Sequence, residues 1–203
     1  MIHRDYICSV LARFEGKAIV RGYVPCKLGT WYPGGPDKGE PLGASGVTIA
    51  TGVDLGQQTA AGLAGLAPDL TAKLLPYLGL KRQEALEKLR TDPLTIGAEE
   101  AAAIDRVIHD RYINETAVLF GREAFDRAPP QVQAVAVSLH YQFGTPAREA
   151  SPALAHAWMS LRTGLYRGAA RFLREPGGWS ADHRQYLSRR QAEAALLDEI
   201  DYA

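Results

Sequence analysis

The sequence predicts an α+β protein with a small β-containing N-terminal part and a larger helical part. A β-branched segment at 47–54 lies between turn-forming stretches, and most of the chain after residue 60 has helical periodicity. The 203 residues show no repeat and no domain linker, so we expect a single domain over 1–203. Within it we expect an N-terminal lobe at about 16–97 and a helical C-terminal lobe at about 98–203 that packs with the first helix.

The composition is that of an ordinary globular protein, with 46% hydrophobic and 23% charged residues. Lys+Arg and Asp+Glu are both 23, so the net charge is zero, which argues against a nucleic-acid binder with its usual basic excess. No segment has the ~20 apolar residues of a membrane span. The N-terminus lacks the apolar region of a secretion signal, so we expect synthesis in the cytoplasm and delivery by another component.

The first helix is predicted over residues 4–15. Four apolar residues follow the i, i+3, i+4, i+7 pattern of one helix face: Ile7, Val10, Leu11 and Phe14. Gly16 is a suitable residue to end a helix. Glu15 is therefore expected in the last turn, where the chain leaves the helix.

Residues 16–47 are rich in Gly and Pro, and we expect a long loop at 31–43, where regular structure is excluded. The next segment, 47–54, is expected to form a short strand with a bend, so that Asp54 lies at its end. Thr59 is placed to cap a helix that starts near Ala60.

The rest of the chain is expected to be helical. The predicted helices are 60–66, 68–77, 81–90, 98–120, 130–143, 151–164, 165–175 and 183–200. At 1.5 Å per residue the helix 98–120 would be about 34 Å long, which suits a helix that joins two lobes.

Signatures of metal and nucleophile sites are missing from the sequence. The five His are scattered, and neither a phosphate-binding loop nor a G-x-S-x-G motif occurs. We therefore expect no metal and no cofactor. Cys8 and Cys26 permit one disulfide, although a buried thiol is the better interpretation of Cys8, which lies in an apolar helical run.

Two carboxylates beside a glycine-rich segment remain as candidates for chemistry. Glycoside hydrolysis uses one protonated and one ionised carboxyl group on opposite sides of the sugar bond. Glu15 at the helix end, next to Phe14, and Asp54 at the strand end fit these two roles. The alternative is that both are ordinary surface carboxylates.

A resemblance to a known family adds to this interpretation. The sequence FEG at 14–16, followed by SGVTIATGVDLG at 45–56, resembles phage-type lysozymes and is closer still to the pesticin-like muramidases. Three further similarities follow in the family's order: Ala136–Gly144, the Trp-bearing turn Gly177–Trp179, and Tyr186–Glu193. The resemblance implies a two-lobed lysozyme fold with a long connecting helix.

The resemblance also implies an active site of a Glu, an Asp and a Thr. Glu15 would protonate the glycosidic oxygen, Asp54 would orient or deprotonate the attacking water, and Thr59 would help to hold that water. In an alternative register Thr48 is the catalytic threonine and Asp54 is structural. In another alternative the long loop brings Asp37 or Glu40 into the cleft.

Four further residues are substrate-binding or supporting candidates. Gln142 could bind a sugar acetamido group, Trp179 could stack on a sugar, and Arg189 or Arg190 could reach Glu15. Packing is the alternative for Gln142 and Trp179, since Trp is mostly buried and a Gln near a helix end can cap it. For the arginines the alternative is a solvated helix face.

The implied activity is that of a muramidase that cleaves the β-1,4 bond between N-acetylmuramic acid and N-acetylglucosamine in peptidoglycan. The reaction would invert the anomeric carbon, with the carboxyl groups ~6.5–9.5 Å apart. We expect a monomeric antibacterial toxin or effector domain that acts at the cell wall and has an immunity protein as its partner. A phage endolysin, a non-catalytic glycan- or protein-binding module, and a chitin-cleaving enzyme are the alternatives.

Overall fold

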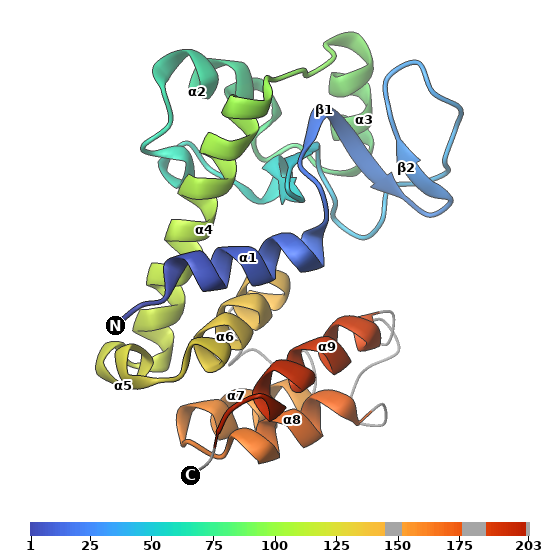
Figure 1. Ribbon diagram of the computed structural model, residues 1–203. Helices are drawn as coiled ribbons and strands as arrows, with labels where there is room; N and C mark the ends of the chain where they lie inside the picture. The colour runs from blue at the N-terminus through green and yellow to red at the C-terminus, as the bar shows by residue number, and fades with distance from the viewer. Residues whose placement is uncertain (145–151, 176–185, 202–203) are drawn as a thin grey trace. The chain divides into compact units, whose positions relative to one another are not determined.

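The computed structural model describes residues 1–144, 152–175 and 186–201. The chain divides into two compact units, which we name the sheet unit (Glu15–Arg111) and the helical unit (Met1–Phe14 with Tyr112–Ala203). Helices α1 (Arg4–Glu15) and α4 (Ala98–Phe120) each supply residues to both units (Figure 1). The helix-rich chain with one small sheet agrees with the predicted α+β class and with a lysozyme-like fold.

The sheet unit contains a four-stranded sheet in the order β2-β1-β3-β4, in which all neighbours are antiparallel. The strands are β1 (Ile19–Cys26), β2 (Gly29–Trp31), β3 (Thr48–Ala50) and β4 (Val53–Asp54). The predicted bent strand at 47–54 is the β3–β4 hairpin, which turns at Thr51 and Gly52. The strands β1 and β2 were not predicted, since Gly22 and Pro25 interrupt the pattern of β1.

The two faces of β1 differ in burial. Gly22, Val24 and Cys26 are buried, whereas Tyr23 and Pro25 are half-buried. A Cβ on Gly22 would lie 3.0 Å from Leu89 of helix α3 (Arg82–Thr91), so the glycine allows this helix to pack directly against the strand. The face of Gly22 is therefore covered by α3, and we call the opposite face the Tyr23 face.

Short helical segments complete the sheet unit: the 3₁₀ turns η1 (Leu55–Gln57), η2 (Ala61–Leu63) and η3 (Leu75–Tyr77), and helix α2 (Pro68–Leu74). The predicted helix 60–66 is wrong beyond the single turn η2. Gly65, with φ at +102°, has a backbone conformation that no helix contains. The predicted helix 68–77 is divided into α2 and η3, consistent with Pro76, which cannot donate a backbone hydrogen bond.

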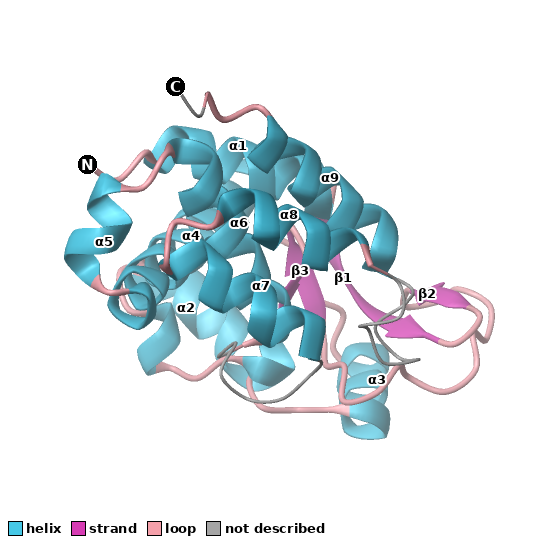
Figure 2. Cartoon of the chain, turned by 90° about the horizontal axis from the view of Figure 1, so that it is seen from below, coloured by secondary structure: helices cyan, strands magenta, loops and turns pink. Residues whose placement is uncertain are grey.

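In the described residues, the helical unit contains α1, the end of α4, and five further helices (Figure 2). These are α5 (Arg122–Arg127), α6 (Pro130–Phe143), α7 (Pro152–Arg162), α8 (Tyr166–Arg174) and α9 (Leu187–Asp198). Helix α8 packs against both α7 and α9, and α6 is buried from Val132 to His140. The predicted helices 98–120 and 130–143 are confirmed to the residue, whereas α5 was not predicted.

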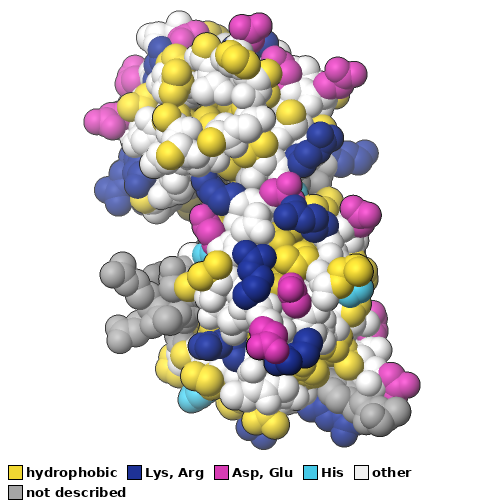
Figure 3. Space-filling view, turned by 90° about the vertical axis from the view of Figure 1, so that its left-hand side faces the viewer, with side chains coloured by type: hydrophobic (Ala, Val, Ile, Leu, Met, Phe, Trp, Pro, Cys, Tyr) yellow, Lys and Arg dark blue, Asp and Glu magenta, His cyan; other side chains and the backbone are white. Residues whose placement is uncertain are grey.

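The surface carries charges of both signs, scattered among each other on the face in Figure 3, in keeping with the zero net charge. Within the described ranges no helix is both long enough and apolar enough to cross a bilayer. Both cysteines are free thiols, so the possible disulfide is not formed. Cys26 is buried, but Cys8 is only partly buried because it lies beside the inward face of α1 and not on it, which corrects the prediction of a buried thiol.

Candidate active site

Glu15 is the last residue of α1, and the helix ends because Gly16 adopts a φ of +84°. The Glu15 side chain extends over the β3–β4 turn. A Cβ built on Gly52 would lie 3.0 Å from its Oε2 atom. Glycine at position 52 therefore leaves the space that the carboxylate occupies.

Asp54 ends β4, and its carboxylate is fixed by the backbone. Its Oδ1 atom accepts hydrogen bonds from the N–H groups of Gly46 (3.0 Å) and Gly56 (2.8 Å). A Cβ on either glycine would come within 2.5 Å of the Leu80 carbonyl oxygen, so only glycine fits at both positions. Burial raises the pKa of Asp54 above its ordinary value, and the two backbone hydrogen bonds oppose that shift.

Thr48 lies directly beside Asp54. The register pairs Tyr23 with Thr48 and Thr48 with Asp54 across β1, β3 and β4. Side chains of residues paired in this way project from the same face of a sheet. The structure thus brings together Thr48 and Asp54, which the sequence analysis gave catalytic roles only in two separate alternatives.

Tyr23 connects the two carboxylates electrostatically. Its pKa is raised to about 12, first by burial and then by the charges of Tyr32, Glu15 and Asp54. The phenol is therefore within electrostatic reach of both acids. Sequence reasoning missed Tyr23 because it missed β1.

Helix α4 supports the hairpin turn from a distant part of the sequence. Asp105 accepts hydrogen bonds from Thr51, at 2.9 Å from the backbone N–H and at 2.6 Å from the hydroxyl. One turn later, His109 is buried, and burial lowers its pKa while the charges of Asp105 and Glu15 oppose that shift. The i, i+4 spacing of Asp105 and His109 was the available signal for this pair.

Thr59 lies in a different setting from Thr48. It is exposed, and its hydroxyl accepts a 3.2 Å hydrogen bond from the N–H of Gly62. This contact closes the η2 turn, which corresponds to the capping role foreseen for Thr59. The register of β3 and β4 includes Thr48 in the row with Asp54 and does not include Thr59.

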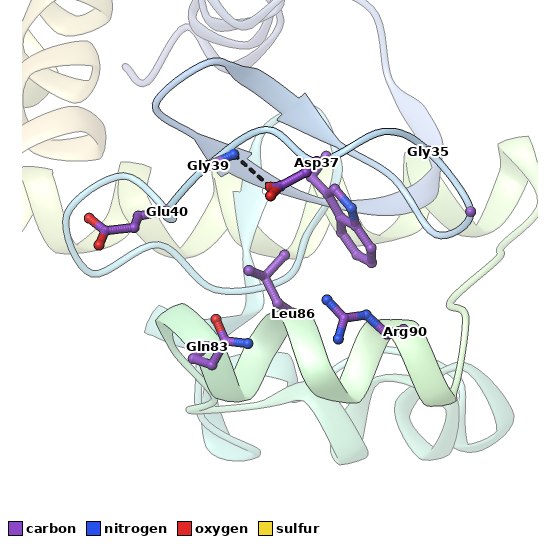
Figure 4. A pocket seen from close by; sticks show the side chains of 9 residues that line it. Gly35, Asp37, Gly39, Glu40, Gln83, Leu86 and Arg90 are labelled. Carbon is purple, nitrogen blue, oxygen red and sulfur yellow. Dashed lines mark hydrogen bonds between the residues drawn. The ribbon is translucent and has the colours of Figure 1, made fainter.

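The long loop does not carry Asp37 or Glu40 to the Tyr23 face. Both line a pocket of about 640 Å³ against the α3 residues Gln83, Leu86 and Arg90 (Figure 4). Asp37 accepts a hydrogen bond from the Gly39 N–H, and Glu40 pairs with Lys27 at 2.7 Å.

The wall of that pocket shows which face it occupies. Trp31 lines it and pairs with Val24, the neighbour of Tyr23 in β1. Successive residues of a strand point to opposite faces, so this pocket lies on the α3 side of the sheet.

Three candidates of the helical unit belong to a buried ion cluster with Ser138 and Glu193: Gln142, Arg189 and Arg190. Glu193 and Arg190 are fully buried and joined at 2.6 Å. Burial raises the pKa of Glu193, and the two arginines oppose that shift. Arg190 also donates to the amide oxygen of Gln142 at 2.7 Å.

Arg189 donates to Ser138, and its guanidinium lies 5.1 Å from the centre of the Phe14 ring. Arg189 and Gln142 thus both take part in hydrogen bonds within the helical unit, and their roles toward the substrate stay predictions. Trp179 lies outside the described residues.

Comparison with known proteins supplies a family. A search of curated proteins finds no match. A family model matches residues 5–161, more than half of the chain, and this span contains Glu15, Thr48, Asp54 and Thr59. The resemblance to pesticin-like proteins is thereby confirmed, and the chain belongs to the Pesticin family, described as a bacterial toxin homologue of phage lysozyme, C-terminal part.

Proposed function

We propose that the protein is a muramidase that hydrolyses the β-1,4 bond between N-acetylmuramic acid and N-acetylglucosamine in peptidoglycan. The observation that carries the proposal is the pair Glu15 and Asp54, whose charges both act on the Tyr23 phenol. Two carboxyl groups at one site are the minimum that glycoside hydrolysis needs. Membership of a family of phage-lysozyme homologues supports the same chemistry.

Glu15 is the general acid in this mechanism and donates its proton to the glycosidic oxygen. It stands at the end of α1, and its carboxyl group lies over the β3–β4 turn. Tyr23 stays protonated at any physiological pH because its pKa is about 12. It acts as a neutral positioning residue within electrostatic reach of the two acids.

Asp54 is the base that activates water. Its Oδ1 is held by two backbone N–H groups, so the other oxygen, Oδ2, is assigned to the water. The raised pKa makes Asp54 a stronger base than an ordinary aspartate. Because water and not Asp54 attacks the sugar, the configuration of the anomeric carbon is inverted.

We assign the water-holding role to Thr48 in preference to Thr59. Thr48 shares a row of the sheet with Asp54, whereas the Thr59 hydroxyl closes the η2 turn. This assignment combines the alternative threonine of the sequence analysis with its preferred aspartate.

The biological role we propose is that of an antibacterial toxin or effector domain that acts on the cell wall of a target cell. Its substrate partner is the glycan strand, and an immunity protein in the producing cell is the expected second partner. The family description as a bacterial toxin favours this role over a phage endolysin.

Mass spectrometry of digested sacculi tests the proposed function. Wild-type protein is expected to release muropeptides with N-acetylmuramic acid at the reducing end and intact stem peptides. Reducing-end N-acetylglucosamine, cleaved peptide bonds, or chitooligosaccharide cleavage without muropeptide release would each refute the assignment. Glycan binding without any product would instead identify a non-catalytic module.

The two threonines can be separated by matched substitutions. Thr48→Val is expected to lower kcat by about tenfold or more, as expected when a group that orients water is lost. Thr59→Val is expected to leave kcat within twofold and to cost about 1 kcal/mol of stability, the usual value for a lost cap. Steady-state kinetics and thermal melting measure both; a loss of kcat in Thr59→Val alone would restore the Thr59 assignment.

Gly52→Ala tests the position of the Glu15 carboxylate. The new Cβ would lie 3.0 Å from Oε2 and displace it, so kcat is expected to fall by about tenfold to 100-fold. Gly79→Ala is the control because its φ of +73° matches the +75° of Gly52 and no atom lies within 4 Å of its Cβ. Equal kcat in the two variants, at similar melting temperatures, would contradict the proposed place of Glu15.

A further inference from the structure

Arg21 is held in a fixed orientation on β1 without a carboxylate partner. Its guanidinium lies 5.9 Å from the centre of the Tyr32 ring and donates to the Pro33 carbonyl oxygen at 3.4 Å. Among the described residues no Asp or Glu forms an ion pair with it, and its side chain is exposed. An arginine held by a ring and a carbonyl, with donors left over, is suited to receive an anion.

Arg21 lies next to the proposed active site. It is two residues before Tyr23 on β1, and the ring of Tyr32 lies beside both side chains. The rings of Tyr32 and Tyr23 are 5.8 Å apart, and the Tyr23 phenol is in turn within electrostatic reach of Glu15 and Asp54. A continuous row of side chains therefore leads from the two acids to the guanidinium.

The surface beside Arg21 is hollowed. A pocket of about 380 Å³ is lined by Ala18, Ile19, Val20, Arg21 and Tyr32. Ala18, which lines the pocket, comes three positions after Glu15 in the chain. A glycan strand bound at the two acids would therefore have this hollow beside it. The pocket thus has an aromatic wall and one cation, and its other lining residues are apolar.

We propose that Arg21, supported by Tyr32, binds a carboxylate of the glycan substrate next to the cleaved bond. This inference rests on the proposed function and names how that site selects its substrate. The planar guanidinium matches a carboxylate through two parallel hydrogen bonds. Peptidoglycan offers that carboxylate from the stem peptide, or from the lactyl group of a muramic acid that carries no peptide. Chitin is uncharged, so Arg21 selects muramic-acid polymers over chitin.

A matched arginine is available as a control. Arg90 also lies 5.9 Å from an aromatic ring, that of Trp31, but it pairs with Glu87 at 3.1 Å. It belongs to α3 and lines the pocket on the other side of the sheet (Figure 4). Arg90→Gln therefore removes the same charge from the same unit without touching the Tyr23 face.

The test measures binding by the full chain in a Glu15→Gln background, with Arg21→Gln or Arg90→Gln added. Three ligands are compared: peptide-bearing glycan strands, amidase-stripped strands with free lactyl carboxylates, and chitooligosaccharides of matched length. Arg21→Gln is expected to weaken binding of carboxylate-bearing strands about tenfold and to leave chitooligosaccharide binding within twofold. Arg90→Gln is expected to change none of the three.

The pattern of losses identifies the source of the carboxylate. Weaker binding of amidase-stripped strands alone indicates the lactyl carboxylate, which is free only where the stem peptide has been removed. Weaker binding of peptide-bearing strands alone indicates the stem peptide, and weaker binding of both strand types indicates that Arg21 binds either carboxylate. Equal behaviour of the two arginine variants, uniform loss that includes chitooligosaccharides, or no strand binding by the parent would overturn the inference. Hydrolysis by the wild type is measured separately, because an inactive wild type refutes the muramidase while the binding result still decides the role of Arg21.

Discussion

Glu15→Gln and Asp54→Asn are each expected to lower the rate of sacculus hydrolysis by ~10²–10⁴-fold, the usual effect of losing a general acid or base. Glutamine cannot protonate the leaving oxygen, and asparagine cannot take a proton from water. Both amides keep the size of the original side chain. The loss should therefore appear in kcat, with substrate binding little changed.

Asp54→Asn has a second expected effect, on stability. The pKa of Asp54 in the folded protein is raised above its ordinary value of 3.8, mainly by burial. The folded state therefore binds this proton more tightly than the unfolded state, and the contribution of Asp54 to stability falls as the pH rises above that value. Asparagine does not ionise, and its carbonyl oxygen can still accept from Gly46 and Gly56.

Thermal melting of Asp54→Asn and wild type from about pH 3 to pH 7 measures this effect. The variant is expected to gain stability relative to wild type as the pH rises, while its activity stays far below that of wild type throughout. A variant that is less stable at pH 7 than at pH 3, relative to wild type, would contradict the buried environment of Asp54. Glu15→Gln serves as the comparison for activity loss.

Glu193→Ala is expected to destabilise the protein by about 3–5 kcal/mol, because removing one partner leaves the other charge buried. Arg190 and Glu193 are both fully buried, and Ser138 donates a further hydrogen bond to Glu193. Urea unfolding followed by circular dichroism gives the change in free energy.

Glu123→Ala is the matched control for this substitution. It breaks an exposed Glu–Arg pair with Arg127, at 2.7 Å and i, i+4 spacing, and should cost at most about 0.5 kcal/mol. If the losses in the free energy of unfolding caused by Glu193→Ala and Glu123→Ala differed by less than about 1 kcal/mol, this would contradict the predicted contribution of the buried ion cluster to stability.

The helices could be predicted from the sequence because their signals are local. The apolar spacing in α1, the length of α4 and the apolar run of α6 each lie within one element. Strand β1 could not be predicted, because its conformation depends on pairing with β2 and β3 and on packing of α3 on Gly22. The spacing of apolar residues along the sequence does not report such long-range contacts.

The candidate site could be predicted in part, because some of its residues have local signals and others depend on long-range contacts. Glu15 and Asp54 stand at element ends that the pattern identifies, and the family resemblance added their roles. The partnership of Thr48 with Asp54 depends on the hairpin register, and that of Thr51 with Asp105 spans 54 residues of sequence. The arginines of α9 were expected on a solvated helix face, but Arg190 is fully buried, where it pairs with Glu193 and donates a hydrogen bond to Gln142.

The configuration of the first product tests the central claim most directly. Proton NMR of a soluble glycan strand, recorded before the sugar mutarotates, reports which anomer of the new reducing end is formed. The α anomer of N-acetylmuramic acid is expected, because Glu15 protonates the β-linked oxygen while Asp54 directs water to the opposite side. The β anomer, or a new reducing end on N-acetylglucosamine, would contradict the account.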